Sequence, residues 1–293
     1  MVALEPLAEK VRALNRFDMG NFVALMDGER SLGAVHEDVA RELLAYPEAV
    51  AVDLGRREVR LRPGSAEERT ERFAAMAAGM HEAGLVPGWR DELFAAQRGF
   101  GTEPVFLIER AAVPVFGLRG YGVHCNGLVR QPDGSHKLWV ARRAKDKATY
   151  PGKLDHIVAG GQPAGIGLME NVIKECGEEA GIPPELARQC ARPAGMVSYR
   201  MELPDKKQLK RDVLFCYDLE LPEDFVPTAV DGEVESFELW DMDDVMHAVA
   251  HTDDFKPNVG LVLIDMFVRR GYVTPDQPGY IALVKSLRAL DCA

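Results

Sequence analysis

The sequence predicts a fold of the α/β (α+β) class. The main domain is expected to be an α/β/α sandwich, with helices on both faces of a mixed sheet, and a small α+β domain is expected to precede it. Three observations support this prediction. The 293 residues are 47% apolar, which is enough for a sizeable core. Patterns typical of strands and helices mix within residues 117–293, as expected of a three-layer sandwich. A glycine-rich stretch leads directly into a helical pattern near residue 167. We therefore expect two domains, 1–116 and 117–293.

The first domain is predicted to combine short helices and strands. Leu4, Leu7, Val11 and Leu14 recur at helical spacing, so residues 3–28 are expected to contain short helices. Ser65 followed by Glu68 forms the capping-box pattern that opens a strong helix. The remaining elements are strands at 31–35, 50–54 and 59–61, a helix at 38–44 and an extended stretch at 91–112.

The second domain begins with a predicted hairpin. The turn signal Gln131-Pro-Asp-Gly134 separates strand patterns at 121–130 and 137–142. A helix at about 167–180 is expected to end at Gly181, a residue type typical of helix C-termini. The other predicted elements are strands at 155–159 and 235–240, a hairpin of 196–203 with 212–221, and helices at 243–251, 257–270 and 279–290.

Charge and cysteine content exclude several classes of protein. The formal net charge of −11 argues against nucleic acid as the main partner, because phosphate neutralisation needs a basic surface. We find no signal peptide and no apolar run long enough to span a membrane, so no membrane partner is expected. The five cysteines form no CxxC pair, which favours neither a disulfide framework nor a zinc site. A reducing, cytoplasmic location is the expectation.

Three carboxylates lie on one face of the helix predicted at 167–180. Glu175, Glu178 and Glu179 are spaced at i, i+3 and i+4, which brings their side chains together. Like charges at these spacings repel one another unless a cation lies between them. Mg²⁺ takes carboxylate oxygens as ligands, so this face is predicted to be one side of a metal site.

The same stretch resembles the signature of the Nudix hydrolases (the MutT-like superfamily): a Gly, five residues, a Glu, seven residues, then Arg-Glu-apolar-x-Glu-Glu-x-Gly-apolar. Gly160 matches the first Gly, and the second half is matched by Glu175, Cys176, Glu178, Glu179, Gly181 and Ile182. Two positions depart from the signature, with Ile166 at the first Glu and Lys174 at the Arg. Since both members of this acid–base pair are replaced, Lys174 is expected to pair with Glu170 instead.

The resemblance implies a metal-dependent site. Glu175, Glu178 and Glu179 match the metal-ligand positions, and a later acidic residue is expected to complete the set, with Glu233 the chosen candidate and Glu235 the alternative. The implied ion is Mg²⁺, with Mn²⁺ as an alternative. Glu178 and Glu175 are the candidate catalytic residues, because a carboxylate in such a site can accept a proton from water.

Substrate contacts are predicted from the loop before the helix and from nearby polar residues. Glycines allow close approach of backbone to phosphate, and basic side chains suit a diphosphate. The candidates are Gly160, Gly161, Arg142, Arg143, Lys153, His124 and Asn126. For the basic residues the competing interpretation is a solvated loop, and for His124 and Asn126 it is a satisfied buried pair.

Further stretches resemble the Nudix proteins related to the partner of thiamin pyrophosphokinase. They include Tyr150-Pro-Gly-Lys-Leu-Asp-His-Ile-Val-Ala-Gly-Gly161 and, in the leading domain, Gly88-Trp-Arg-Asp-Glu92. This resemblance implies cleavage of thiamine diphosphate or its oxidised analogues to a monophosphate and phosphate. The leading domain is then expected to cap the site, to form a homodimer surface or to recognise the organic part of the ligand.

Other functions fit the same motif. One is a pyrophosphatase acting on nucleotide sugars, ADP-ribose or coenzyme A. Another is an isopentenyl diphosphate isomerase, for which Cys125 is ambiguously placed. A third is a Nudix-like domain that binds a diphosphate and regulates without turnover. The intact set of Glu175, Glu178 and Glu179 argues against the last interpretation.

Overall fold

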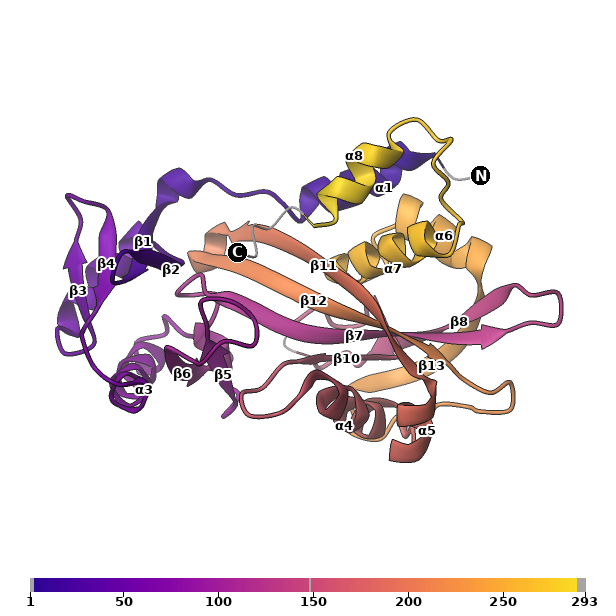
Figure 1. Ribbon diagram of the computed structural model, residues 1–293, viewed down its shortest axis with the longest axis horizontal. Helices are drawn as coiled ribbons and strands as arrows, with labels where there is room; N and C mark the ends of the chain where they lie inside the picture. Colours follow the sequence, from indigo (N-terminus) through magenta and orange to yellow (C-terminus); the bar gives the residue numbers. More distant parts are fainter. Residues whose placement is uncertain (1–2, 148, 289–293) are drawn as a thin grey trace.

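The computed structural model describes residues 3–147 and 149–288, which form two units lying side by side (Figure 1). Backbone hydrogen bonds join the units. The N–H of Ala34 donates to the carbonyl of Phe116 at 3.1 Å, and the N–H of Leu209 donates to that of Pro114 at 2.9 Å. Among the described residues, no helix has both the length and the apolar character required to cross a membrane.

The smaller unit is built on a four-stranded sheet in the order β2-β1-β4-β3. Its helix α3 (Ala66–Glu82) starts at Ser65, whose side chain forms the predicted capping box with Glu68. One hydrophobic core joins this helix to the sheet and to a two-stranded hairpin. The elements are β1 (Phe22–Asp27), β2 (Arg30–His36), α2 (Glu37–Glu42), β3 (Val50–Asp53), β4 (Glu58–Leu61) and the hairpin β5 (Leu93–Ala96) and β6 (Phe106–Glu109).

The larger unit is a seven-stranded mixed sheet with helices on both faces, which confirms the predicted fold class. Its main order is β11-β12-β7-β8-β13, with β10 paired to β7 and β9 paired to β8. The β7–β12 pair is parallel, and the other pairs are antiparallel. The strands are β7 (Arg119–Arg130), β8 (His136–Arg143), β9 (Leu154–Asp155), β10 (Val158–Gly161), β11 (Ala191–Leu203), β12 (Gln208–Glu220) and β13 (Val234–Asp241).

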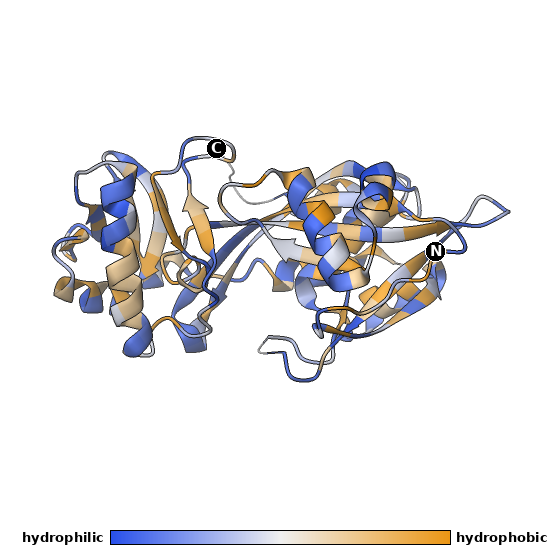
Figure 2. Cartoon of the chain, turned by 90° about the horizontal axis from the view of Figure 1, so that it is seen from below, coloured by the Kyte–Doolittle hydropathy of each residue, from blue (hydrophilic) through white to orange (hydrophobic). Residues whose placement is uncertain are grey.

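Two helical layers enclose this sheet. Helices α4 (Leu168–Ala180) and α5 (Pro184–Cys190) cover one face, and α6 (Met242–His251) and α7 (Pro257–Arg269) cover the other (Figure 1). Seen from below, the helices on the near face carry hydrophilic and hydrophobic residues side by side, as amphipathic helices on a sheet do (Figure 2). Alternate residues of β7 reach opposite cores: Val123 and Cys125 pack toward α4, and Leu128 toward α7.

The first helix packs with the last ones. Helix α1 (Leu4–Ala13) lies beside α8 (Tyr280–Ser286) in Figure 1, and its buried face, including Leu7, shares a core with α6, α7 and α8. The chain thus starts against the larger unit, crosses to the smaller one and returns.

Three predictions about elements need correction. Residues Phe22–Asp27 form strand β1, although the segment 3–28 is predicted to contain helices. Leu25 and Met26 suit a helix by propensity, but pairing of β1 with both β2 and β4 overrides this weak preference. Strand β11 begins at Ala191, earlier than predicted, directly after the unpredicted helix α5. Helix α8 ends at Ser286, and positions 289–290 of the helix predicted there lie outside the described residues.

Candidate functional site

The site lies where β10 turns into α4. The helix begins after a turn in which Gly165 has φ of +89°, and it ends at Gly181, whose φ of +63° is the left-handed conformation expected of a helix C-terminus. Gly160 and Gly161 instead belong to β10 and have no positive φ. These two residues must be glycine for a different reason, which is the closeness of their neighbours.

Gly160 makes room for the side chain of Glu175. A Cβ atom at position 160 would lie 2.2 Å from Cδ and 2.4 Å from Oε1 of Glu175, so any other residue there would displace the Glu175 side chain. The next residue, Gly161, faces the other unit, since a Cβ there would lie 2.6 Å from the ring of Phe94 and 3.1 Å from Cζ of Arg110. The strand therefore holds the Glu175 carboxylate on one side and the smaller unit on the other.

The three helix carboxylates lie in different surroundings. Glu178 is half exposed, whereas the side chain of Glu175 is only 13% exposed. Glu179 is the most buried of the three, and its Oε2 accepts a hydrogen bond from the N–H of Ala159 at 2.8 Å. Burial raises the pKa of Glu175 and raises that of Glu179 further, because the charged forms lose water. Negative charge on this face is therefore costly without a cation.

Lys174 supplies a cation to two of these carboxylates. Its Nζ lies 3.1 Å from Oε1 of Glu175 and 2.9 Å from Oε2 of Glu178. The predicted pair of Lys174 with Glu170 is therefore wrong. Oε2 of Glu170 instead accepts a weak hydrogen bond, at 3.4 Å, from the N–H of Gly167 at the start of the helix. An acid in the first turn is favoured there by the helix dipole.

Glu233 lies in the segment just before β13, and its place among the metal ligands stays a prediction. Its carboxylate pairs with Nζ of Lys147 at 2.5 Å and is half exposed. Although burial alone would raise the pKa of Glu233, Lys147 lowers it, with smaller contributions from Arg143 and Arg110. The alternative candidate, Glu235, pairs with Lys145 at 3.4 Å.

Arg110 is a site residue that the sequence does not predict. It follows β6 in the smaller unit, pairs with Glu92 at 2.8 Å and lies over the ring of Phe94 at 5.5 Å. Its Cζ lies 3.1 Å from where a Cβ of Gly161 would stand, beside the strand that holds Glu175. Its charge opposes the rise in the pKa of Glu175 caused by burial and contributes to lowering the pKa of Glu233. Only the tertiary contact between the units brings it there, and no local pattern in the sequence signals that contact.

The predicted basic residues are largely engaged by the protein. Arg143 donates to Oδ2 of Asp155 at 2.9 Å and to the carbonyls of Thr149 and Tyr150, so it stabilises the loop that follows β8. Arg142 donates to the carbonyl of Gly152 at 3.1 Å. Lys153 donates to the carbonyl of Asp253 and borders a separate cavity beside α6 and α7. A role for these three residues in binding substrate stays a prediction.

His124 and Asn126 lie on the face of β7 that is turned toward α7, away from α4. Asn126 is fully buried and donates to Oδ1 of Asp218 at 2.8 Å, where Arg269 of α7 also binds. His124 lies with its Nδ1 3.0 Å from Nδ1 of His156. Each therefore has its own buried partner, and they do not pair with each other. Their proposed contact with substrate stays a prediction.

Among the described residues, one trio of potential metal ligands has atoms all within 4.8 Å of one another, namely His124, Asp155 and His156. However, Oδ2 of Asp155 already holds Arg143 at 2.9 Å and Lys256 at 3.2 Å. Two positive charges on one carboxylate leave no net negative charge to offset a divalent cation. The trio is better described as a buried hydrogen-bond network.

Two family models match adjacent parts of the chain. A domain of unknown function, DUF4743, matches residues 6–120, and the NUDIX domain matches residues 120–259. The junction falls at the start of β7, where the larger sheet begins.

Similar proteins occur in a plant and in yeast. Nudix hydrolase 24, chloroplastic, from Arabidopsis thaliana is 43% identical over 97% of this chain and 78% of its own length. Nudix hydrolase 20, chloroplastic, from the same plant is 41% identical over the same shares. Uncharacterized protein YJR142W from Saccharomyces cerevisiae is 36% identical over 85% of this chain and 75% of its own length. The similarity thus spans both units.

Proposed function

This chain belongs to the Nudix hydrolases, and from that premise we propose that it is a Mg²⁺-dependent pyrophosphatase acting on a small organic diphosphate. Water cleaves the bond between the two phosphates, so the products are an organic monophosphate and inorganic phosphate. The observation that carries the proposal is the close contact between Gly160 and Glu175. The Glu175 carboxylate occupies the space that a Cβ at position 160 would fill, which places an acidic group beside β10.

The donor atoms of these carboxylates suit a hard divalent cation, but their oxygens must first converge, because the one trio of ligand atoms within 4.8 Å among the described residues is that of His124, Asp155 and His156. Glu175, Glu178, Glu179 and Glu233 offer oxygen donors only, the set that Mg²⁺ prefers and Mn²⁺ accepts. Burial raises the pKa values of Glu175 and Glu179, which means that their charged forms cost free energy in the folded protein. A bound cation would offset that free-energy cost. Lys174 must leave Glu175 and Glu178 for both to act as ligands. When bound, the ion neutralises charge that develops on the diphosphate and lowers the pKa of water.

Other side chains have roles that follow from their positions. Glu175, with its raised pKa and fixed carboxylate, is suited to accept a proton from the attacking water, and Glu178 is the alternative acceptor. Arg110 and Lys147 flank the acidic residues and can bind phosphate oxygens. The space that Gly160 and Gly161 leave is filled by Glu175 and by Phe94 with Arg110, so these glycines serve to place those groups close to the strand.

Thiamine diphosphate, or one of its oxidised analogues, is the proposed substrate. Support comes from the resemblance of residues 150–161 and 88–92 to the thiamine-linked Nudix branch. We also propose a reducing, cytoplasmic location, in line with the unpaired thiols of Cys125, Cys176, Cys190 and Cys216.

Turnover of a substrate panel tests this function. The protein is incubated with Mg²⁺ and thiamine diphosphate, an oxidised thiamine diphosphate, ADP-ribose or coenzyme A, and monophosphate release is measured. Release from the thiamine compounds alone supports the proposal. Faster release from ADP-ribose or coenzyme A would show that one of these, and not thiamine diphosphate, is the preferred substrate. No release from any compound would refute the proposal that the protein hydrolyses these diphosphates.

Two variants connect turnover to the helix. Glu178→Gln removes a charge from the site and is expected to lower kcat by at least about 100-fold. The control is Glu185→Gln on α5, where an exposed carboxylate pairs with Arg188 at 2.9 Å. Equal rates in both variants would show that the acidic face of α4 does not carry the reaction.

A further inference from the structure

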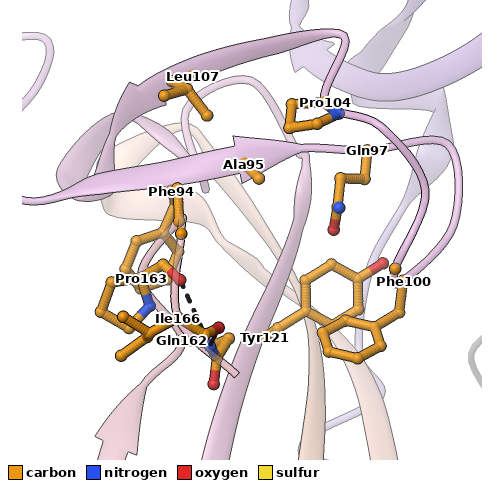
Figure 3. Close-up of a pocket in the computed structure, with 13 residues that line it drawn as sticks. Phe94, Ala95, Gln97, Phe100, Pro104, Leu107, Tyr121, Gln162, Pro163 and Ile166 are labelled. Atoms are coloured by element: carbon orange, nitrogen blue, oxygen red, sulfur yellow. Dashed lines mark hydrogen bonds between the residues drawn. The ribbon is translucent and has the colours of Figure 1, made fainter. Parts of the chain in front are cut away.

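A cavity of about 500 Å³ lies between the two units, directly beyond the glycine strand (Figure 3). Its walls come from β5 and the following loop in the smaller unit, and from Tyr121 and residues 162–166 in the larger one. This volume falls within the range of about 300–1,000 Å³ that is typical of small-molecule sites. A hydrogen bond from the N–H of Ala164 to the carbonyl of Leu93, at 2.9 Å, joins the two walls.

Among the described residues, those that line the cavity carry no charged side chain. Its side chains are apolar or aromatic, apart from the amides of Gln97 and Gln162 and the hydroxyl of Tyr121. Gln162 is committed within the larger unit: its Nε2 donates to the carbonyl of Ile166 at 2.8 Å, and its Oε1 accepts from Asn171 at 3.2 Å. A charged group placed here would lose water without gaining a partner, so the cavity favours an uncharged ligand.

Aromatic rings form much of the wall. Phe100 is 46% exposed, an unusual position for a large apolar side chain, and its ring lies 4.9 Å from that of Tyr121. Phe94 closes the end nearest the acidic site, where Arg110 lies over its ring. Figure 3 shows the rings of Phe94, Phe100 and Tyr121 around one space, with Gln97 directed toward it. Such rings bind a flat heterocycle by stacking.

The cavity adjoins the acidic site along a single strand. Gly160 contacts Glu175, Gly161 contacts Phe94 and Arg110, and Gln162 begins the cavity wall. Two residues of extended chain span about 7 Å, which is the scale of the distance between a diphosphate and a ring carried by the same small molecule. Ile166, which replaces the first Glu of the Nudix signature, also lines this cavity. An apolar residue there agrees with an apolar wall.

We propose that this cavity binds an uncharged aromatic ring of the substrate while the diphosphate lies at Glu175, Glu178 and Glu179. The smaller unit thereby recognises the organic part of the substrate. The inference rests on the proposed pyrophosphatase function and narrows its substrates to diphosphates that carry a flat, neutral heterocycle. The pyrimidine of thiamine diphosphate is one such ring.

Substrates with and without a ring test this proposal. We compare kcat/KM for thiamine diphosphate and for methyl diphosphate, which presents the same reacting group without a ring. Phe100→Ala is expected to lower kcat/KM for thiamine diphosphate at least about five-fold, the lower end for loss of a stacking ring. Methyl diphosphate should be hydrolysed at an unchanged rate. Phe17→Ala is the matched control, since Phe17 is 40% exposed and lies against Arg200, outside the cavity.

A second variant fills the cavity instead of enlarging it. Ala95→Phe adds a ring to the wall contributed by β5 and should exclude the heterocycle, with the same selective loss as Phe100→Ala. Thermal unfolding of each variant verifies the fold. Equal losses for both diphosphates, or no loss for either, in the folded variants would overturn the proposal.

Failure of the proposed function can be distinguished from failure of this inference. If the protein hydrolyses no diphosphate, calorimetric binding of thiamine itself still reports on the cavity. Weaker binding in Phe100→Ala than in Phe17→Ala would support the ring site although the hydrolase proposal had failed. Equal thiamine binding in the wild type and Phe100→Ala would exclude it.

Discussion

Oε2 of Glu179 accepts a hydrogen bond from the N–H of Ala159 at 2.8 Å, which ties α4 to the outer edge of β10. The bond needs an acceptor but not a charge. Burial raises the pKa of this carboxyl well above its usual range, so the charged form costs free energy in the folded protein.

Glu179→Gln is therefore expected to separate stability from activity. The amide oxygen can keep the bond to Ala159 while the buried charge is lost. We expect the free energy of unfolding at pH 7 to rise, because the cost of the buried charge is removed, and Mg²⁺-dependent turnover to be lost. Urea unfolding and phosphate release measure the two effects. A destabilised variant that kept its activity would contradict this account.

Gly160→Ala should displace the Glu175 carboxylate. The new methyl group would lie 2.2 Å from Cδ, so the acid must move by about an ångström or more. A displacement of this size can cost about 100-fold in rate, and we expect kcat to fall by that order. Gly167→Ala is the control, since a Cβ there meets nothing within 4 Å. Steady-state kinetics measure kcat for both variants. Equal kcat values for Gly160→Ala and Gly167→Ala would show that close packing of Gly160 against Glu175 does not matter for the reaction.

Lys174→Met should increase the apparent affinity for Mg²⁺. Lys174 lies within 3.1 Å of both Glu175 and Glu178, where it competes with a divalent cation for the same oxygens. Removal of one positive charge at this distance changes the binding free energy of the cation by about 1 kcal/mol in the dielectric of water, which is roughly a five-fold change in the apparent Kd for Mg²⁺. Titration of turnover with Mg²⁺ measures it, with the exposed Lys206→Met as control. An unchanged or weaker Mg²⁺ dependence in Lys174→Met would count against competition.

Stability should fall as the pH drops below neutral, in part because of His156. Burial lowers the pKa of His156 from 6.5 to about 4, with Asp155 opposing the shift. Between these pH values the unfolded chain binds a proton that the folded protein excludes. The free energy of unfolding therefore decreases as pH falls through this window, by up to about 3 kcal/mol from this residue. Above pH 6.5 the contribution is fully retained.

Urea unfolding from pH 7.5 to 4 tests the role of His156. In His156→Asn the decline with falling pH should be shallower than in the wild type. A residual slope is expected, since burial also lowers the pKa of His124. His247→Asn serves as control because His247 is exposed on α6. Parallel pH profiles for wild type and His156→Asn would show that another group governs the decline.

Local patterns predict the parts of the site that depend on neighbours in the sequence. The spacing of Glu175, Glu178 and Glu179, the helix end at Gly181 and the capping box of Ser65 are all interactions within a turn or two of helix. The same reasoning fails for Lys174, because Glu170 and Glu178 are equally spaced from it. The structure selects Glu178, which lies on the side of Glu175.

Long-range contacts account for what could not be predicted. Strand β1 depends on partners in β2 and β4, and Arg110 reaches the acidic site only through the contact between the units. Alternation along β7 requires that His124 and Asn126 share a face, but only the completed sheet shows that this face is turned toward α7. The cavity likewise needs both units, so neither half of the sequence contains it.

The packing of α1 against α8 has a consequence for synthesis on the ribosome. Leu7 leaves the exit tunnel long before Leu283, with which it shares a buried cluster in the folded protein. At about 5–20 residues per second, the apolar face of α1 waits on the order of tens of seconds before these partners exist. During that interval Leu4, Leu7 and Val11 lack the core that buries them in the finished fold, and transiently exposed apolar surface of this kind is prone to aggregation.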